Sequence, residues 1–387
     1  MIGASILGRS ASRTTSGRGY GFDFWLVVAA ALLLAVGVMA IYSEGYGKPG
    51  GGYFRAHLLR LAIGVIPFLI FFKVDPQWWR RAAVPLYILN LALLALVIAK
   101  GSAAKGAQRW LELGPIEFQP SEMSKLIAVL AISAYYANRA RDVGRFSTFF
   151  WSFLYILPTL ILVFKQPHLG ATLVILVAWL SVSIFAQVPW KYIIGMFAAI
   201  AAALVMAWNI PGILQPYQKE RILAMFVTDD QDKNYQQLRA SIAFAEGGVS
   251  GTGFLKGEQK AGRFIPEQHT DFIFSVIGEE GGLIGCSLVL AAYAFFFFRG
   301  WLVMYRADDP FLRMLAAGVV SILAFHTIVN LAMNLQIAPV VGLWLPFMSY
   351  GGTALWLCMA CVGLLLNLSA GSRNIMFSTS DGVSSRL

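Results

Sequence analysis

Apolar residues occur along the chain in blocks of about twenty, separated by shorter polar stretches, and this is the length at which an α-helix crosses about 30 Å of hydrocarbon. The blocks are 24–43, 57–73, 82–99, 122–137, 148–165, 169–187, 190–209, 272–298, 312–335 and 353–369. We therefore expect an all-α polytopic membrane protein, a bundle of about ten transmembrane helices, with one membrane domain over residues 24–369.

The polar stretches between the blocks predict the orientation of the chain. If the ten spans alternate, every stretch on the cytoplasmic side carries lysine or arginine near a helix end, as the positive-inside rule requires. These residues are Arg9, Arg13, Arg18, Lys73, Arg80, Arg81, Arg139, Arg141, Arg145, Lys191, Arg299, Arg306, Arg313, Arg373 and Arg386. The first block is longer than a signal-peptide core and has no convincing cleavage site, so it is predicted to be an uncleaved anchor. We expect a multi-pass protein of the cytoplasmic (inner) membrane with cytoplasmic tails at 1–23 and 370–387.

The same alternation places residues 44–56, 100–121, 210–271 and 336–352 outside the cytoplasm. Residues 210–271 form the large extracytoplasmic (periplasmic) loop, between the seventh and eighth spans. Its stretch "NYQQLRASIAFAEGGVSGTGF" predicts short amphipathic helices on the outer membrane face. The glycines at the end of this stretch break the helical pattern and allow a close approach of the backbone to another group. The pattern fits a simple turn as well as a ligand loop. These glycines are Gly247, Gly248, Gly251 and Gly253.

The composition supports the membrane assignment, with 58% hydrophobic and 13% charged residues. The net charge of +10 would suit a nucleic-acid partner, but the basic residues are spread between the apolar blocks, so topology explains them better. We expect no nucleic-acid partner. Cys286, Cys358 and Cys361 all lie within apolar blocks, which predicts small core residues and no disulfide or metal site.

Polar residues at membrane depth are expensive to bury and often serve function. Glu122 and Lys125 lie at positions i and i+3 of one predicted helix, where they can pair. A structural ion pair and a functional one are equally open. His326, Asn330 and Asn334 follow one another at helical spacing, and we expect this stripe to form hydrogen bonds between helices and not to act in catalysis.

Asp271 stands at the start of an unusually long block. The twenty-seven residues of 272–298 would span roughly 40 Å as a helix, more than the hydrocarbon core. "GEEGG" interrupts this block at 278–282, so Glu279 and Glu280 are predicted to lie at the interface or to face a hydrated interior. Asp271 itself fits a helix cap and a functional carboxylate equally well.

Four stretches, in order, resemble the landmarks of one family. They are "RWLELGPIEFQPSEMSKL" at 109–126, "KQPHLGATLVI" at 165–175, "PEQHTDFIFSVIGEEGGLIG" at 266–285 and "PVVGLWLPFMSYGGTALW" at 339–356. Together they resemble the SEDS family (shape, elongation, division and sporulation), whose best-known members are RodA, FtsW and SpoVE. The resemblance implies a peptidoglycan glycosyltransferase that polymerises lipid II outside the cytoplasmic membrane. It also implies a class B penicillin-binding protein as partner, along with elongation-complex membrane proteins.

Within the family, "NLQIAPVVGLWLPFMSYGG" is closer to the RodA pattern than to the FtsW pattern, which implies a role in elongation and rod shape; an FtsW-type septal polymerase is the alternative. Asp271 matches the family's catalytic aspartate and is expected to act as the general base. Arg109, Lys125 and Arg221 are candidate cations for the departing pyrophosphate. The further candidate substrate-binding residues are Glu122, Lys165, His168, His269, Thr270 and Ser349.

His168 departs from the family pattern, because many members have an acidic residue at this position. A histidine can accept a proton but supplies no standing negative charge. "SYGGT" at 349–353 precedes the last block, where free N–H groups suit an anion, although a simple turn fits too. No metal-ligand spacing such as HExxH occurs, so we predict no metal residue and no certain cofactor, and leave a divalent cation open.

Two other classes of function compete with the enzyme. A lipid II flippase is suggested by ten spans and polar residues at membrane depth, but the halves show no convincing internal repeat, and the polar landmarks crowd one side. A non-catalytic scaffold for cell-wall enzymes predicts that Asp271 can be replaced without loss.

Overall fold

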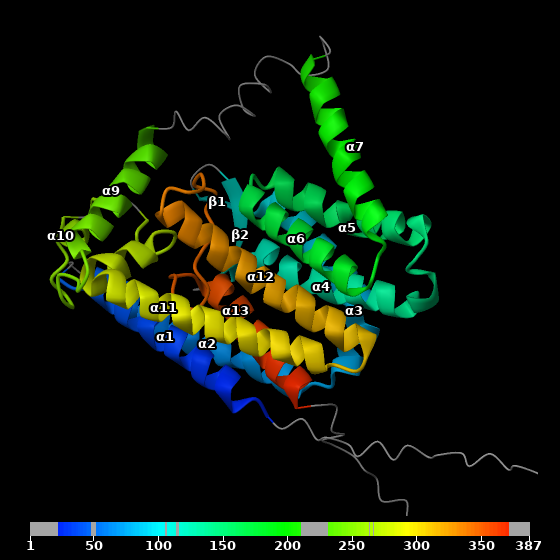
Figure 1. The fold of residues 1–387 in the computed structure, drawn as a ribbon, viewed down its shortest axis with the longest axis horizontal. Coiled ribbons are helices and arrows are strands. Elements are labelled where there is room, and N and C mark those ends of the chain that lie inside the picture. The colour runs from blue at the N-terminus through cyan, green and yellow to red at the C-terminus, as the bar shows by residue number, and fades with distance from the viewer. Residues whose placement is uncertain are drawn as a thin grey trace, which may run out of the picture.

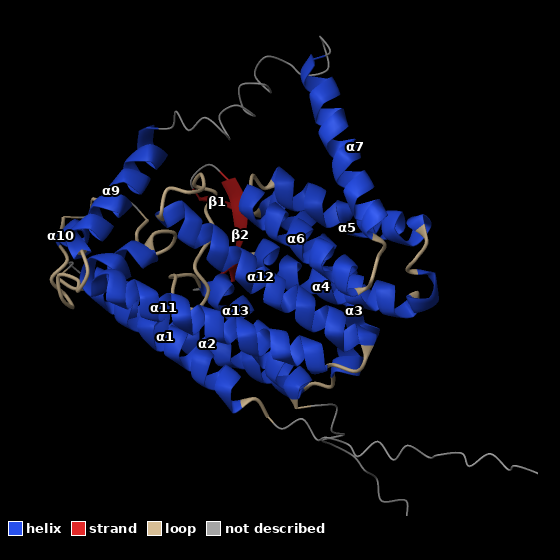
Figure 2. Cartoon of the chain, viewed as in Figure 1, coloured by secondary structure: helices blue, strands red, loops and turns tan. Residues whose placement is uncertain are grey.

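The computed structural model describes residues 22–47, 52–104, 107–113, 116–209, 231–262, 264–265 and 267–370. Each of the ten predicted apolar blocks is a helix; these helices pack into a bundle, except that α7 projects away from it (Figures 1 and 2). These helices are α1 Phe24–Gly45, α2 Gly52–Lys73, α3 Pro76–Lys100, α4 Pro120–Asn138, α5 Phe146–Lys165, α6 Leu169–Phe185, α7 Trp190–Asn209, α11 Ile273–Arg306, α12 Pro310–Asn334 and α13 Gly352–Ser369. A single 3₁₀ turn, η1 (Ala140–Asp142), separates α4 from α5.

Among the described helices, seven are long and apolar enough to cross a membrane, judged by length and composition; they are α1, α2, α3, α5, α11, α12 and α13. Two of the other predicted spans are shorter apolar helices, α6 and the part of α7 over Trp190–Ala202. The chain is a multi-pass membrane protein. Several helices extend past their apolar block, as α3 does, because Asp75 caps it and Pro76 occupies its first turn.

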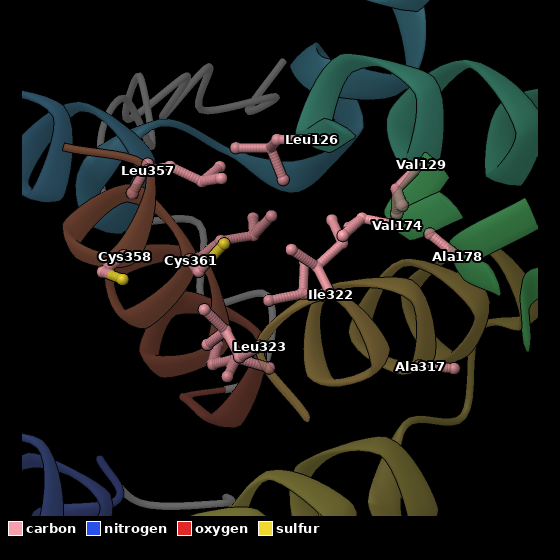
Figure 3. Packing of buried hydrophobic residues seen from close by; sticks show 14 of the residues in the cluster. Leu126, Val129, Val174, Ala178, Ala317, Ile322, Leu323, Leu357, Cys358 and Cys361 are labelled. Carbon is pink, nitrogen blue, oxygen red and sulfur yellow. The ribbon is translucent and has the colours of Figure 1, made fainter. Parts of the chain in front are cut away.

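The centre of the bundle is α13, of whose apolar window 78% is buried, compared with 11% for α2. Figure 3 shows Cys361 and Leu357 of α13 near Leu126 of α4 and Leu323 of α12. A helix that is apolar on all sides can lie among other helices or face lipid, and the burial of α13 shows that other helices cover most of its surface. The three cysteines are buried and free, as the sequence predicts.

The stretch 100–121 adds a small sheet that the sequence did not predict. Its strands are β1 Ser102–Ala104, β2 Ala107–Leu113 and β3 Ile116–Phe118, all antiparallel in the order β1-β2-β3. Leu111 pairs with Phe118, and Glu112 with Glu117. Large and β-branched side chains on such short strands favour pairing once a turn brings them together. The sheet positions Arg109 at one end of the bundle.

The described part of the large loop forms α9 (Gln231–Gly247) and α10 (Glu258–Ala261). Both lie at the end of the bundle where α11 begins, which we call the Asp271 end (Figure 1). An amphipathic helix was expected, but α9 places its apolar face on protein and not only on the membrane. Ala240 and Ala243 are fully buried in a small cluster with Ile265 and Phe272.

The predicted interruption of α11 is present at Gly282, whose φ of 61° and ψ of −159° are not helical. Here the backbone bonds with a segment of the large loop, residues 248–253, which we call the inserted turn. Leu283 N donates to Gly248 O at 2.9 Å, and Ile284 N donates to Val249 O at 3.2 Å. The loop thus satisfies the N–H groups that the break leaves without a helical partner.

The carbonyl groups on the other side of the break are satisfied in the same way. Glu279 O accepts from Thr252 N at 2.9 Å, and Glu280 O accepts from Gly253 N at 3.1 Å. A Cβ at Gly251 would clash with the carbonyl of Glu280. The glycine run therefore allows a close approach of one backbone to another, as the sequence analysis expected.

The side chains of Glu279 and Glu280 are buried and bound by the loop, in a group we call the Lys260 cluster. Glu280 Oε1 accepts from Ser43 Oγ at 2.6 Å and from Leu255 N at 3.0 Å, and it pairs with Lys260 Nζ. Glu279 Oε1 accepts from Gln259 N at 2.7 Å. The two carboxylates are thus buried beneath the large loop, with 0% of Glu279 and 9% of Glu280 exposed.

Candidate functional site

Asp271 is not the N-cap of α11, because Phe272 occupies that position. The chain does use aspartate caps elsewhere. Asp23, Asp75 and Asp309 each precede a helix and accept a hydrogen bond from an N–H of its first turn, at 3.0, 2.8 and 2.7 Å respectively. Asp271 lies one position before the N-cap of α11.

The backbone of Asp271 is held on both sides. Its N–H donates to Glu267 O at 3.2 Å. Its carbonyl accepts from the side-chain amides of Asn330 at 2.8 Å and Asn334 at 3.0 Å, both on α12. The polar stripe on α12 therefore forms hydrogen bonds between elements, as predicted. The half-buried Asp271 side chain lies beside Gly342, where a Cβ would be 3.7 Å from Oδ2.

The segment before Asp271 is tied to the "SYGG" segment. Tyr350 N donates to His269 O at 2.8 Å, and Ser349 Oγ donates to Thr270 O. Ser349 Oγ also accepts from Leu345 N at 2.7 Å. Four residues that the sequence selected, His269, Thr270, Asp271 and Ser349, thus form one group, the Asp271 group.

Aromatic and cationic residues of α2 adjoin this group, and the sequence analysis missed them. The imidazole of His269 stacks on Tyr53 with ring centroids 4.1 Å apart. The guanidinium of Arg60 lies 4.1 Å from the ring centroid of Tyr350. A lone arginine inside an apolar block was the available signal for Arg60, since such a charge is rarely placed in a span without a partner.

Glu122 and Lys125 form the predicted pair, fully buried, at the start of α4. Lys125 Nζ donates to the two carboxylate oxygens of Glu122 at 2.7 and 2.8 Å and contacts His326 Nε2 at 3.0 Å. An ammonium only donates, so Nε2 accepts, and the proton of His326 is on Nδ1, 3.3 Å from Trp344 O. The indole Nε1 of Trp344 donates to Glu122 Oε2 at 2.9 Å. We call these four residues the Lys125 network.

All three N–H groups of Lys125 are used within this network, and its side chain is inaccessible. In this conformation Lys125 faces protein and not a ligand. Arg109 is similarly engaged, donating from Nε to Gln166 O at 2.9 Å and from Nη2 to Pro167 O. Lys125 would have to exchange partners to bind a phosphate, whereas Arg109 uses two of its five N–H donors in these bonds and is only half-buried.

His168 lies beside the Lys125 network, at the N-cap of α6. Its Nδ1 is 3.2 Å from Ser121 Oγ and 3.4 Å from Gln119 Nε2. Burial, helped by the nearby charges of Lys125 and Arg109, holds the pKa of His168 well below its usual value. The imidazole is therefore neutral at physiological pH, and it adds no charge at the position where many family members have an acid.

Two further predicted residues are Lys165 and Arg221. Lys165 is exposed at the last position of α5. Arg221 lies outside the described residues. Within the ranges that the structure describes, no group of three or more His, Cys, Asp and Glu side chains is arranged to hold a metal ion.

One helix connects the two groups of candidate residues. On α12, His326 contacts Lys125, and Asn330, one turn later, donates to the carbonyls of both Asp271 and Leu343. The Asp271 group and the Lys125 network thus flank the same end of α12. A shift of this helix end would change both.

Comparison with known proteins agrees with this architecture. The profile of the FtsW/RodA/SpoVE family, described as "Cell cycle protein", matches residues 23–374. The peptidoglycan glycosyltransferase MrdB of Escherichia coli K12 is 34% identical over 319 residues, which cover 82% of this chain and 85% of that protein. The probable peptidoglycan glycosyltransferase FtsW of Geobacter sulfurreducens (strain DL-1 / KN400) is 36% identical over 361 residues, 90% of this chain and 95% of that protein.

Solved structures give the same result. A structure described as "Structural coordination of polymerization and crosslinking by a peptidoglycan synthase complex" aligns with a TM-score of 0.75 and 29% identity, over 90% of this chain and 97% of that one. The crystal structure of the rod shape determining protein RodA of Thermus thermophilus aligns with a TM-score of 0.65 and 27% identity, over 90% and 96% of the two chains. The chain therefore belongs to the FtsW/RodA/SpoVE family, as the four sequence stretches indicated.

Proposed function

We propose that this protein is a peptidoglycan glycosyltransferase that polymerises lipid II at the outer face of the cytoplasmic membrane, with Asp271 as general base. The observation that carries the proposal is the relationship, over more than four-fifths of the chain, to proteins named peptidoglycan glycosyltransferases. The geometry agrees with it, because a half-buried carboxylate is held at one end of the bundle by elements far apart in the sequence.

The reaction joins a sugar hydroxyl to an anomeric carbon as lipid diphosphate leaves. A base must take the hydroxyl proton, and the fixed backbone of Asp271 gives its carboxylate a restricted range of positions from which to do so. Asn330 and Asn334 are positioning residues in this scheme, since they bind the carbonyl and not the carboxylate. His269, Thr270 and Ser349 hold the adjacent backbone.

Arg109 and Lys125 differ in how freely their side chains can turn toward the diphosphate. Arg109 is half-buried and Lys125 fully buried, so Arg109 is the better placed of the two to turn toward a diphosphate. Glu122, with His326, fixes the position of the Lys125 charge. Arg221, Lys165 and His168 remain candidate substrate-binding residues on the strength of the family resemblance.

We infer that the cellular role is elongation and rod shape, with both termini in the cytoplasm and a class B penicillin-binding protein as partner. The RodA-like "SYGG" segment and the positive-inside pattern support this choice, and the complex described for one structural neighbour, which coordinates polymerisation and crosslinking, supports the partner. Depletion should round the cells. Unsegmented filaments would instead indicate the septal role of an FtsW-type enzyme.

The decisive experiment supplies fluorescent lipid II in detergent to the full chain purified with its partner. We expect polymer from wild type and a loss of about 10²–10⁴-fold in rate for Asp271→Asn and Asp271→Ala, the contribution typical of a general base. Asp308→Asn, an exposed acid between α11 and α12, is the matched control and should polymerise normally.

The outcomes separate the competing functions. Polymer from folded Asp271→Ala would refute the assignment of Asp271. A flippase needs a bilayer with two sides and would make no polymer in detergent with any variant. A scaffold would likewise make none, yet would support growth when Asp271 is replaced.

A further inference from the structure

The first turn of α13, at the Asp271 end of the bundle, has backbone N–H groups that no carbonyl of the helix can bind. α13 begins at Gly352, and its N-cap, Gly351, provides no side-chain cap. The first N–H groups of a helix have no partner within it and carry a partial positive charge. Thr353 does not cap them, because its Oγ1 accepts from Gln119 N at 3.0 Å and lies 3.4 Å from Glu117 O.

Arg60 adds a full charge beside this turn. Its guanidinium covers the ring of Tyr350, and a Cβ at Gly352 would lie 3.5 Å from Arg60 Nε. Such a Cβ would also lie 3.6 Å from Arg60 Cδ and 3.8 Å from Cγ, so the Arg60 side chain passes directly over the helix start. The backbone at Arg60 is fixed, since Arg60 O accepts from Trp356 Nε1 of α13 at 2.9 Å. Within the described ranges, no salt bridge involves Arg60.

His57 is an independent sign of a missing ligand. It lies one turn before Arg60 on the same face of α2, and its ring centroid is 6.2 Å from that of Tyr350. The side chain is 0% exposed, yet neither Nδ1 nor Nε2 has a hydrogen-bond partner among the described residues. A buried polar group without a partner costs free energy, and such groups often mark a site that binds a water, an ion or a ligand.

We propose that Arg60, His57 and the first turn of α13 form a subsite for the diphosphate of a polyprenyl-linked donor. The eighteen residues of α13 span about 27 Å, so its first turn lies near the boundary of the hydrocarbon, at the depth of a lipid headgroup. A guanidinium beside free N–H groups suits a diphosphate, which offers several oxygens to both.

The subsite adjoins the proposed base, and this inference rests on the proposed function. Ser349 and Tyr350 donate hydrogen bonds to the backbone carbonyls of Thr270 and His269. These two bonds join the segment before α13 to the segment that carries Asp271. A diphosphate bound here would place the anomeric carbon on the side of the bundle where Asp271 lies. The leaving group and the base would then share one rigid frame.

Glu117 opposes an anion at this site and provides a matched control. It is exposed on β3, and its charge acts on Tyr350, raising the pKa of that phenol together with burial, the larger cause. Removing the Glu117 charge should therefore strengthen diphosphate binding, whereas removing the Arg60 charge should weaken it.

The test measures binding of three probes to the purified full chain in detergent: polyprenyl diphosphate, inorganic pyrophosphate and polyprenol. We expect Arg60→Gln to weaken polyprenyl diphosphate binding by about tenfold or more, Arg60→Lys to weaken it less, and Glu117→Gln to strengthen it about two- to threefold. His57→Leu should weaken it while leaving the unfolding temperature unchanged or higher, because an unpaired buried imidazole is replaced by an apolar group. Polyprenol binding should not change in any variant.

Unchanged diphosphate binding in Arg60→Gln would overturn the proposal, and so would an equal loss of polyprenol binding in every variant. If inorganic pyrophosphate shows the same dependence on Arg60, the diphosphate alone is recognised; if only the lipid form does, a headgroup site is supported. The proposed function is tested separately, because Asp271→Asn should still bind polyprenyl diphosphate while failing to polymerise lipid II.

Discussion

The described part of the chain contains two buried lysine–glutamate pairs at the same end of the bundle, and they are built differently. Lys125 and Glu122 lie three residues apart on one helix, with 0% and 3% of their side chains exposed. Lys260 and Glu280 join a loop to a different helix, with 5% and 8% exposed. The first pair is set by helical spacing alone, whereas the second exists only after the large loop has docked on α11.

The difference shows what each pair can do. The Lys125 network connects α4, α12 and the segment of Trp344, so it fixes the spacing of spans. The Lys260 cluster connects α1, α10 and α11 and holds the loop that leads to Asp271. We infer that the first pair maintains the bundle and the second maintains the position of the loop.

Lys125→Met should have the largest effect on stability, because it leaves Glu122 buried with only the indole of Trp344 as a donor. We expect a loss of about 3–5 kcal/mol, measured by chemical unfolding in detergent. The double variant Glu122→Gln with Lys125→Met should recover part of this loss. A single variant as stable as wild type would show that the network does not hold the spans together.

The break in α11 offers a comparison between two neighbouring glycines. Gly282→Ala should cost about 2–3 kcal/mol, since φ is positive there and a Cβ would clash with the inserted turn. Gly281→Ala, where a Cβ meets no atom within 4 Å, is the matched control and should be near neutral. Thermal unfolding checks both, and equal effects would contradict the docking described for the turn.

Lys260→Met should have a smaller and more local effect than Lys125→Met. Glu280 keeps its bonds from Ser43 and Leu255, so we expect a loss of about 1–2 kcal/mol. Hydrogen exchange should rise in residues 248–262 and stay unchanged in α4 and α12. Exchange that rises equally in both regions would mean that the two pairs belong to one cooperative unit.

We expect replacement of His168 to have the smallest effect on stability, and this effect depends on pH. Its pKa is lowered on folding, so the unfolded chain takes up a proton near pH 6.5 while the folded chain does not. Proton uptake by the unfolded chain therefore lowers the free energy of unfolding as the pH falls below 6.5. The loss is about 1 kcal/mol at pH 5.5. His168→Gln should flatten that part of the profile, and an unchanged slope would assign it to other groups.

The sequence predicted the elements whose determinants are local. Ten apolar blocks became ten helices, the Glu122–Lys125 pair formed, and the "GEEGG" interruption appeared at Gly282. The partners that come from elsewhere could not be predicted. Lys260 carries no periodic signal that points to Glu280, and the strands at 102–118 are too short to stand out from a loop.

The candidate site divides in the same way. His269, Thr270, Asp271 and Ser349 were chosen from the sequence and lie together, while Arg60 and His57 were missed because they lie in or at the edge of an apolar block. The hydrogen bonds of Lys125 and Arg109 to protein groups also could not be predicted from the sequence. Residue type indicates which groups can bind an anion, but only packing decides which of them are already occupied.

The backbone bonds of residues 248–253 to α11 make this segment unusual for a loop. Surface loops commonly accept tags, insertions and protease cleavage. Here the loop completes the hydrogen bonding of a membrane helix some thirty residues further along the chain. For anyone who labels or engineers this protein, a peptide placed at 248–253 is equivalent to a peptide placed inside a transmembrane helix.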